Sequence, residues 1–168
     1  ALTQAALGRT VLATVLDQRN RPVVDIEVDD FVVREAGRSR EVLSARVADY
    51  PVVVLVDTSG RARGEFESIR QAAIRFITRI GQRPVAVGTT GASPALIASF
   101  DDVREVVLQR LRALTPEENG RSQALQGMAT AARSLRVLDV PFSTIVVLST
   151  NPETAVGDAP TEWLQQIS

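Results

Sequence analysis

The chain has 168 residues, of which 45% are hydrophobic and 23% are charged, and its formal net charge is −1. These values are typical of one medium-sized globular domain, alone or with a small appendage, and they exclude a disordered chain. The near-neutral charge creates no field that would attract nucleic acid or an acidic membrane. Histidine, lysine and cysteine are absent, and all 19 basic residues are arginine. The sequence therefore excludes a lysine phosphate loop, a lysine Schiff base, Ser-His-Asp and Cys-His nucleophiles, and the usual zinc sites.

No run of the sequence approaches the roughly 20 apolar residues of a membrane-spanning helix, so we expect no direct membrane span. The first six residues lack the basic start and the long apolar core of a signal peptide. The sequence does not begin with methionine, as expected of a mature N-terminus after cleavage or of a trimmed chain. The lack of cysteine fits a cytosolic or an exported protein equally.

Residues 8–48 alternate apolar and polar side chains in short runs, which predicts a small N-terminal β unit. Residues 17–22 are typical of a turn, and residues 32–34 and 42–44 are predicted to pair as a hairpin around Gly37. Pro51 favours an extended Tyr50 and marks a boundary. We expect a separate α/β domain over residues 51–168.

The α/β domain opens with the most informative segment of the chain. Five apolar residues at 52–56 stop at Asp57, followed by Thr58, Ser59 and Gly60. So short a run, rich in valine, predicts a strand buried on both faces, with Asp57 at its carboxyl end. That end of the strands is where open α/β sheets hold their ligand sites.

The rest of the domain alternates helices and strands. A helix is predicted over 64–80, with an apolar stripe formed by Phe66, Ile69, Ala73, Ile77 and Ile80. Strands follow at 84–89, at 95–100 as an edge candidate, and at 143–150. Between them we expect one helix capped by Asp101 or Asp102 and ending at residues 115–116, and another capped by Ser122; a last short helix begins near Pro160. This order predicts a Rossmann-like, doubly wound, mainly parallel sheet flanked by helices.

Three segments resemble the von Willebrand factor type A domain, whose metal-ion-dependent adhesion site begins with Asp-x-Ser-x-Ser after a buried strand. Asp57 and Ser59 fit this motif, and Arg61 replaces its last serine. Residues 118–122 resemble the family's Gly-Gly-Thr loop, with Ser122 in the place of the threonine. Residues 143–153 resemble its strand ending in Thr-Asp-Gly-Glu, with Asn151 in the place of the second acid. A complete domain of this family would continue with a further strand and a final helix, so we expect the C-terminal strand or strands to be missing here.

Residues 8–48 are similar to the β-rich segment that precedes this domain in secreted bacterial proteins described as VWFA-related. This similarity implies an exported bacterial protein, periplasmic or on the cell surface.

The adhesion-site resemblance implies metal ligands at Asp57, Ser59, Ser122 and Asn151, but the residues favour a second interpretation. Mg²⁺ takes octahedral oxygen ligands that usually include one or two carboxylates, and Asp57 is the only acid at these positions. Arg61 adds a fixed positive charge, and two unit charges about 4 Å apart repel by about 4 kcal/mol at an effective dielectric constant near 20. Arg61 and Asn151 therefore disfavour Mg²⁺, and we expect no cofactor. Asp57 then caps a turn, and Arg61 either forms a forked pair with Asp57 or lies solvated.

These observations predict a non-enzymatic module that binds another protein or an assembly subunit. We expect its contact face at Asp57, Ser59, Arg61, Ser122 and Asn151, with a degenerate and metal-independent site. An alternative is a structural or accessory subunit engaged through the N-terminal β unit or an open sheet edge. An enzyme is the least supported class, because neither a Lys, a His nor a second acid accompanies Asp57 at the matched positions. We therefore expect no catalytic residue.

Overall fold

A computed structural model describes residues 8–23 and 25–150 of the chain. The chain divides into two compact units, Ala1–Ala48 and Asp49–Ser168. Asn151 and the predicted helix near Pro160 lie outside the described residues.

The first unit contains a short 3₁₀ helix, η1 (Val28–Asp30), and a hairpin of β1 (Val33–Glu35) and β2 (Arg38–Arg40). Ala36 and Gly37 form the turn with φ values of 49° and 78°. A two-residue turn of this kind needs positive φ at both positions, which glycine adopts readily. The hairpin was correctly predicted around Gly37, but its second strand at 42–44 was wrong, because a two-residue turn starts the returning strand at once.

The turn predicted at residues 17–22 is confirmed. Leu16 and Pro22 form an isolated antiparallel bridge across it. The Asp17 carboxylate accepts hydrogen bonds from the backbone N–H groups of Arg19 and Arg21 at 2.8 and 2.9 Å. Aspartate favours turns because its side chain can replace backbone acceptors in this way.

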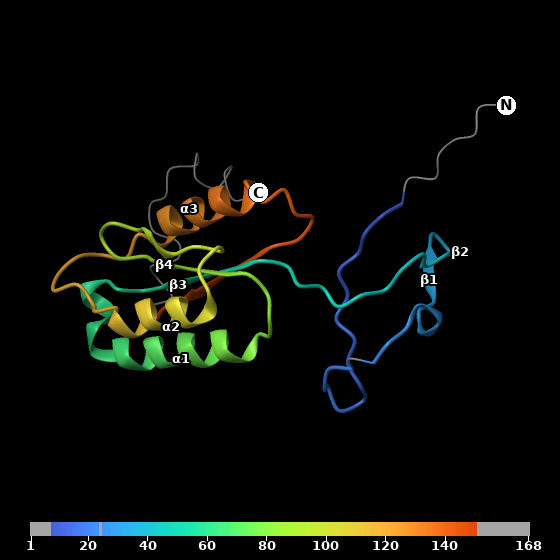
Figure 1. Cartoon of the computed structure of the whole chain (residues 1–168), viewed down its shortest axis with the longest axis horizontal. Helices are drawn as coiled ribbons and strands as arrows, with labels where there is room; N and C mark the ends of the chain where they lie inside the picture. The colour runs from blue at the N-terminus through green and yellow to red at the C-terminus, as the bar shows by residue number, and fades with distance from the viewer. Residues whose placement is uncertain (1–7, 24, 151–168) are drawn as a thin grey trace. The chain divides into compact units, whose positions relative to one another are not determined.

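The second unit is built on a four-stranded sheet of β3 (Val52–Val56), β4 (Val85–Thr89), β5 (Leu96–Ala98) and β6 (Thr144–Leu148). Its strand order is β5-β4-β3-β6, with β3 parallel to both β4 and β6 and with β5 antiparallel to β4 (Figure 1). The mainly parallel sheet and the edge position of β5 were both predicted from the sequence. Every residue of β3 and β4 is buried, as expected of central strands covered on both faces.

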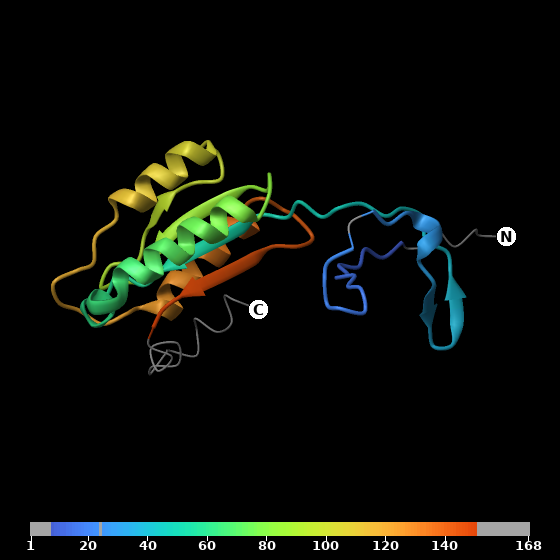
Figure 2. The ribbon, with the colours of Figure 1, turned by 90° about the horizontal axis from the view of Figure 1, so that it is seen from below.

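Helices α1 (Phe66–Arg79) and α2 (Arg104–Ala113) cover one face of the sheet, and α3 (Ala124–Arg136) covers the other (Figure 2). The alternation of side chains along β3 divides the core accordingly. Val54 packs in the cluster that includes α1 and α2, whereas Leu55 packs in the cluster that includes α3. The predicted apolar stripe of α1 is buried at four of its positions, Phe66, Ile69, Ala73 and Ile77. The helix begins later than predicted because Gly60–Glu65 forms a 3₁₀ helix, η2, in front of it.

The predicted cap of α2 is wrong. Its N-cap residue is Val103, which has no side chain that could cap the helix. The Asp102 carboxylate instead accepts hydrogen bonds from the Ser99 N–H at 2.7 Å and from Arg110 at 2.8 Å. The Asp102 side chain thus stabilises the turn that follows β5, and α2 begins only after Val103.

In the part of the chain that the structure describes, none of the helices combines the length and the apolar character needed to cross a membrane.

The Ser99 backbone N–H, helped by the charge of Arg110, lowers the pKa of Asp102 below its usual value. A carboxyl group whose pKa is lower in the folded state stabilises the fold above its unfolded pKa, and this stabilisation is lost as the pH falls through the folded pKa. We therefore expect Asp102→Asn to lower the free energy of unfolding at pH 7. The difference from the unmutated chain should shrink as the pH falls below about 3.8, the ordinary pKa of the group.

Urea unfolding between pH 2.5 and pH 7 measures this effect. The matched control is Asp101→Asn, at an exposed neighbour. Equal pH dependence in Asp102→Asn and the unmutated chain would contradict the prediction.

Candidate functional site

Three parallel strands end at the same edge of the sheet, and polar residues follow each of them. Asp57, Thr58 and Ser59 follow β3, Thr90 follows β4, and Ser149 follows β6. The backbone continues the pairing one step past the strands, because Asp57 N–H donates to Leu148 and Thr90 N–H donates to Val56, both at 3.0 Å. The strand ends are therefore held in register, and their side chains converge.

Asp57 is 1% exposed, yet its carboxylate is satisfied within the protein. One oxygen accepts the Ser59 backbone N–H at 3.0 Å, and the other accepts the Ser149 hydroxyl at 2.6 Å. The first bond is the turn cap predicted from the sequence. The second links the end of β3 to the end of β6.

The hydroxyl groups around Asp57 differ in how they are satisfied. Thr58, Ser59 and Thr90 are buried at 3%, 0% and 0% exposure. The Thr90 hydroxyl lies 3.0 Å from that of Ser122. The Ser59 hydroxyl, in contrast, is buried and makes no hydrogen bond with the described residues. We call Asp57, Thr58, Ser59 and Thr90 the polar centre.

Ser122 is therefore brought to the site, but not in the role of a helix cap. Gln123 is the N-cap residue of α3, with no side-chain capping bond. The predicted Ser122 cap is wrong, because the Ser122 hydroxyl is directed to Thr90 instead.

The segment between α2 and α3 lies against the polar centre. Glu117 N–H donates to the Thr58 carbonyl at 2.8 Å, and Gln123 N–H donates to the Thr90 carbonyl at 2.6 Å. Gly60 faces the same segment so closely that a Cβ added there would lie 3.0 Å from the Asn119 Cα. We call residues 117–123 the cover segment.

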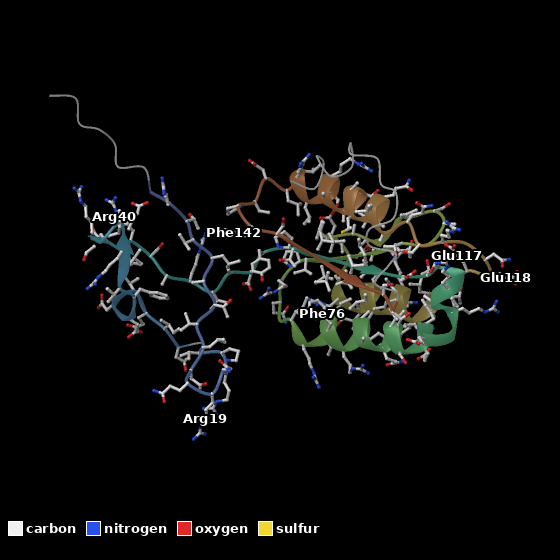
Figure 3. The ribbon with its side chains drawn as sticks, turned by 180° about the vertical axis from the view of Figure 1, so that it is seen from behind. Arg19, Arg40, Phe76, Glu117, Glu118 and Phe142 are labelled. Carbon is white, nitrogen blue, oxygen red and sulfur yellow. The ribbon has the colours of Figure 1, made fainter. Side chains whose placement is uncertain are left out.

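The Glu117 carboxylate gives the cover segment a further attachment. The Ala92 N–H lies 3.0 and 2.9 Å from its two oxygens. A Cβ at Gly91 would lie 1.9 Å from Glu117 Oε1 and 2.5 Å from the Thr58 hydroxyl, so only glycine leaves room for this contact. Glu117 and its neighbour Glu118 differ in exposure. Glu118 is exposed, whereas Glu117 is partly buried (Figure 3).

Arg61 lies in η2 directly after Gly60, and it is exposed. Of the two arrangements predicted for it, the forked pair with Asp57 is not formed within the described residues, where Asp57 is bound by Ser59 and Ser149. Arg61 is solvated at the rim of the site.

The comparisons with known proteins agree with this geometry. The family model of the von Willebrand factor type A domain matches residues 52–151, more than half of the chain. The chain belongs to the von Willebrand factor type A domain family. No curated protein matches it.

Two solved structures share the fold of this von Willebrand factor type A domain. The vWF domain of the type V pili tip protein Mfa5 from Porphyromonas gingivalis has a TM-score of 0.50 and 18% identity over 60% of this chain and 37% of that one. Proximal thread matrix protein 1 from the mussel byssus has a TM-score of 0.54 and 12% identity over 70% of this chain and 34% of that one. The present chain thus spans little more than a third of either protein.

The resemblance to the family's adhesion site implies a divalent cation held by Asp57, Ser59 and Ser122. The described residues fit such an ion poorly. The Asp57 oxygens and the Ser122 hydroxyl already have protein partners. Over residues 8–23 and 25–150, no group of three acidic, histidine or cysteine side chains is placed to hold a metal ion. Asp57 is the only carboxylate among the implied ligands, where Mg²⁺ usually takes one or two. Of the three implied ligands, the Ser59 hydroxyl alone has no hydrogen bond to the described residues.

Sequence reasoning did not single out three residues that the structure places here. Ser149 and Thr90 could have been found, since each comes within two residues of a predicted parallel strand's carboxyl end, where sites of this fold gather. Glu117 gave no such signal. Its role depends on the close approach of Gly91, which joins segments 25 residues apart.

Replacing Asp57 tests whether the site depends on its hydrogen bonds or on its charge. Asp57→Ala leaves the buried Ser59 N–H without a partner, and we expect it to lower the free energy of unfolding by about 1–3 kcal/mol. Asp57→Asn can accept from Ser59 and donate to the Ser149 oxygen, so it should cost less than about 1 kcal/mol.

Urea unfolding of both variants in EDTA makes the comparison. If Asn is as damaging as Ala, the charge is essential and the hydrogen-bond account of Asp57 is wrong.

Proposed function

We propose that this chain is a non-enzymatic protein–protein interaction module of an exported bacterial protein, located in the periplasm or on the cell surface. Its contact face lies at the carboxyl end of the sheet, with Asp57, Ser59, Arg61, Ser122 and Asn151 as the central residues. The observation that carries the proposal is the exposed Arg61 at the rim of a polar centre that three strand ends and the cover segment build. Arginine is suited to such a face because its planar guanidinium recognises carboxylates through two parallel hydrogen bonds.

The similar structures support the proposed setting. One comes from a pilus tip protein and the other from a byssal thread matrix protein, and both names place those proteins in assemblies outside the cell. An assembly partner and export are therefore reasonable for this chain as well. The lack of Lys, His and Cys, and the absence of a cluster of acids among the described residues, support a role without catalysis.

We also propose that the contact does not require a metal. The Asp57 carboxylate is held by Ser59 and Ser149, which leaves it no need of a cation for its hydrogen bonds. The fixed charge of Arg61 near the site opposes a divalent ion, as Coulomb's law requires. Asn151, in the position of the family's second acid, adds no charge.

A second candidate is an accessory subunit joined through a sheet edge or through the first unit. Strand β6 is the last strand of the described sheet, and Val147 is 36% exposed. An exposed edge strand can pair with another chain. In the first unit, large apolar side chains such as Val11, Val32 and Leu43 are 77–79% exposed, and exposed apolar surface of this kind marks interaction sites.

Photo-crosslinking in the native cell tests the proposed contact face. A photoreactive amino acid replaces either Arg61, exposed in η2, or Arg121, exposed in the cover segment, in the full-length protein. The matched control is Arg79, an exposed arginine at the far end of α1. We expect a crosslinked protein partner from positions 61 and 121, with and without EDTA, and none from position 79.

Two results would count against parts of this proposal. Crosslinks confined to probes at Val147 or Leu43 would favour the accessory-subunit candidate. Crosslinks from position 61 that disappear in EDTA would keep the contact face but contradict its independence of metal.

A further inference from the structure

The polar centre is covered in this structure. Asp57, Thr58, Ser59 and Thr90 have between 0% and 3% of their surface exposed, although they lie at the end of the sheet where a partner would bind. A contact face whose central side chains are buried cannot use them without a change of conformation. The proposed contact therefore either uses only exposed residues such as Arg61, or requires a change of conformation that exposes the polar centre.

The buried Ser59 hydroxyl favours an opening step. Buried polar groups are nearly always hydrogen-bonded, and a group that is not raises the free energy of the state that buries it. Opening would let water or a partner group reach this hydroxyl. The buried Ser59 hydroxyl thus destabilises the closed state, and opening would expose this same group.

The cover segment is held closed by few bonds. Two are backbone hydrogen bonds, from Glu117 to Thr58 and from Gln123 to Thr90. The third joins the hydroxyl groups of Ser122 and Thr90. The fourth is the bond from Ala92 N–H to the Glu117 carboxylate, and it is the charge-assisted one among them. Glu117 also fills the space beside Gly120, where a Cβ would lie 3.0 Å from its other oxygen. The glutamate is thereby fixed between two glycines.

We propose that the cover segment closes the polar centre and that the bond between the Glu117 carboxylate and Ala92 N–H holds it closed, as a latch. A partner then reaches Ser59 and Asp57 only when this bond breaks and the segment moves away. The proposal rests on the proposed function and adds a regulatory step to the same face. Glu117 is a positioning residue in this scheme, because it acts through Ala92 and the backbone of the cover segment. Its neighbour Glu118 is exposed and takes no part in the latch.

The lack of cysteine in the chain permits a direct test. Ser59→Cys introduces a single thiol at a hydroxyl that makes no hydrogen bond within the described residues, so the replacement removes no such contact. The rate at which this thiol reacts with DTNB reports how often the cover opens. Ser68→Cys, at an exposed position of α1, gives the rate of an unprotected thiol.

We expect the Ser59→Cys variant to react at least about a hundred times more slowly than the Ser68→Cys variant, because its thiol reacts only in the open state. Adding Glu117→Ala to Ser59→Cys should raise the rate about tenfold or more, which is the change expected from losing one charge-assisted hydrogen bond. Adding Glu118→Ala, the matched control, should leave the rate unchanged. Glu117→Gln, which keeps an acceptor for Ala92 N–H without the charge, should give an intermediate rate.

Urea unfolding of each variant separates local opening from global unfolding. If Glu117→Ala does not fold, the Glu117→Gln variant decides, since a rate equal to that of Glu118→Ala would then overturn the latch. Equal rates for Glu117→Ala and Glu118→Ala would likewise overturn it, as would a Ser59→Cys rate near that of Ser68→Cys. No partner is used here, so this result stands apart from the crosslinking that tests the contact face.

Discussion

The carboxylate of Asp57 is the group on which the rest of the site depends. It lies at the end of the central strand, 1% exposed, and a buried charge must be satisfied by the protein or by a bound ion. Here the Ser59 N–H and the Ser149 hydroxyl satisfy it, so one side chain fixes the turn after β3 and joins it to β6. The positions of Thr58, Ser59 and Gly60 follow from that turn.

The neighbouring loops build on the same turn. Thr58 supplies the carbonyl that Glu117 N–H binds, and Gly60 supplies the close contact with Asn119. The cover segment thus rests on residues that Asp57 holds in place. Arg61 follows directly and lies at the exposed rim. One arrangement therefore accounts for the buried polar centre, the exposed Arg61 and the position of the cover segment.

Much of the fold follows from local sequence patterns, whereas the site depends on longer-range contacts. The buried β3, the apolar stripe of α1 and the edge strand β5 are each read from a period or a run of side chains. The Asp102 cap was wrong because Ser99 and Arg110 bind that carboxylate. The Ser122 cap was wrong because the Thr90 hydroxyl, 32 residues away in the chain, is the partner of that side chain. The hairpin strand was misplaced because the positive φ of Ala36 cannot be read from its identity. Glu117 could not be predicted because its partners are on another loop.

We propose that the protein itself satisfies the Asp57 carboxylate, without a divalent cation. Thermal unfolding in EDTA and then in 10 mM Mg²⁺ or Mn²⁺ tests it most directly. We expect the same melting temperature in both conditions. A ligand at about 100 times its dissociation constant adds about 2.7 kcal/mol to the free energy of unfolding, which is readily seen. A saturable rise that Asp57→Asn abolishes would show that a cation binds at Asp57 and would contradict the account.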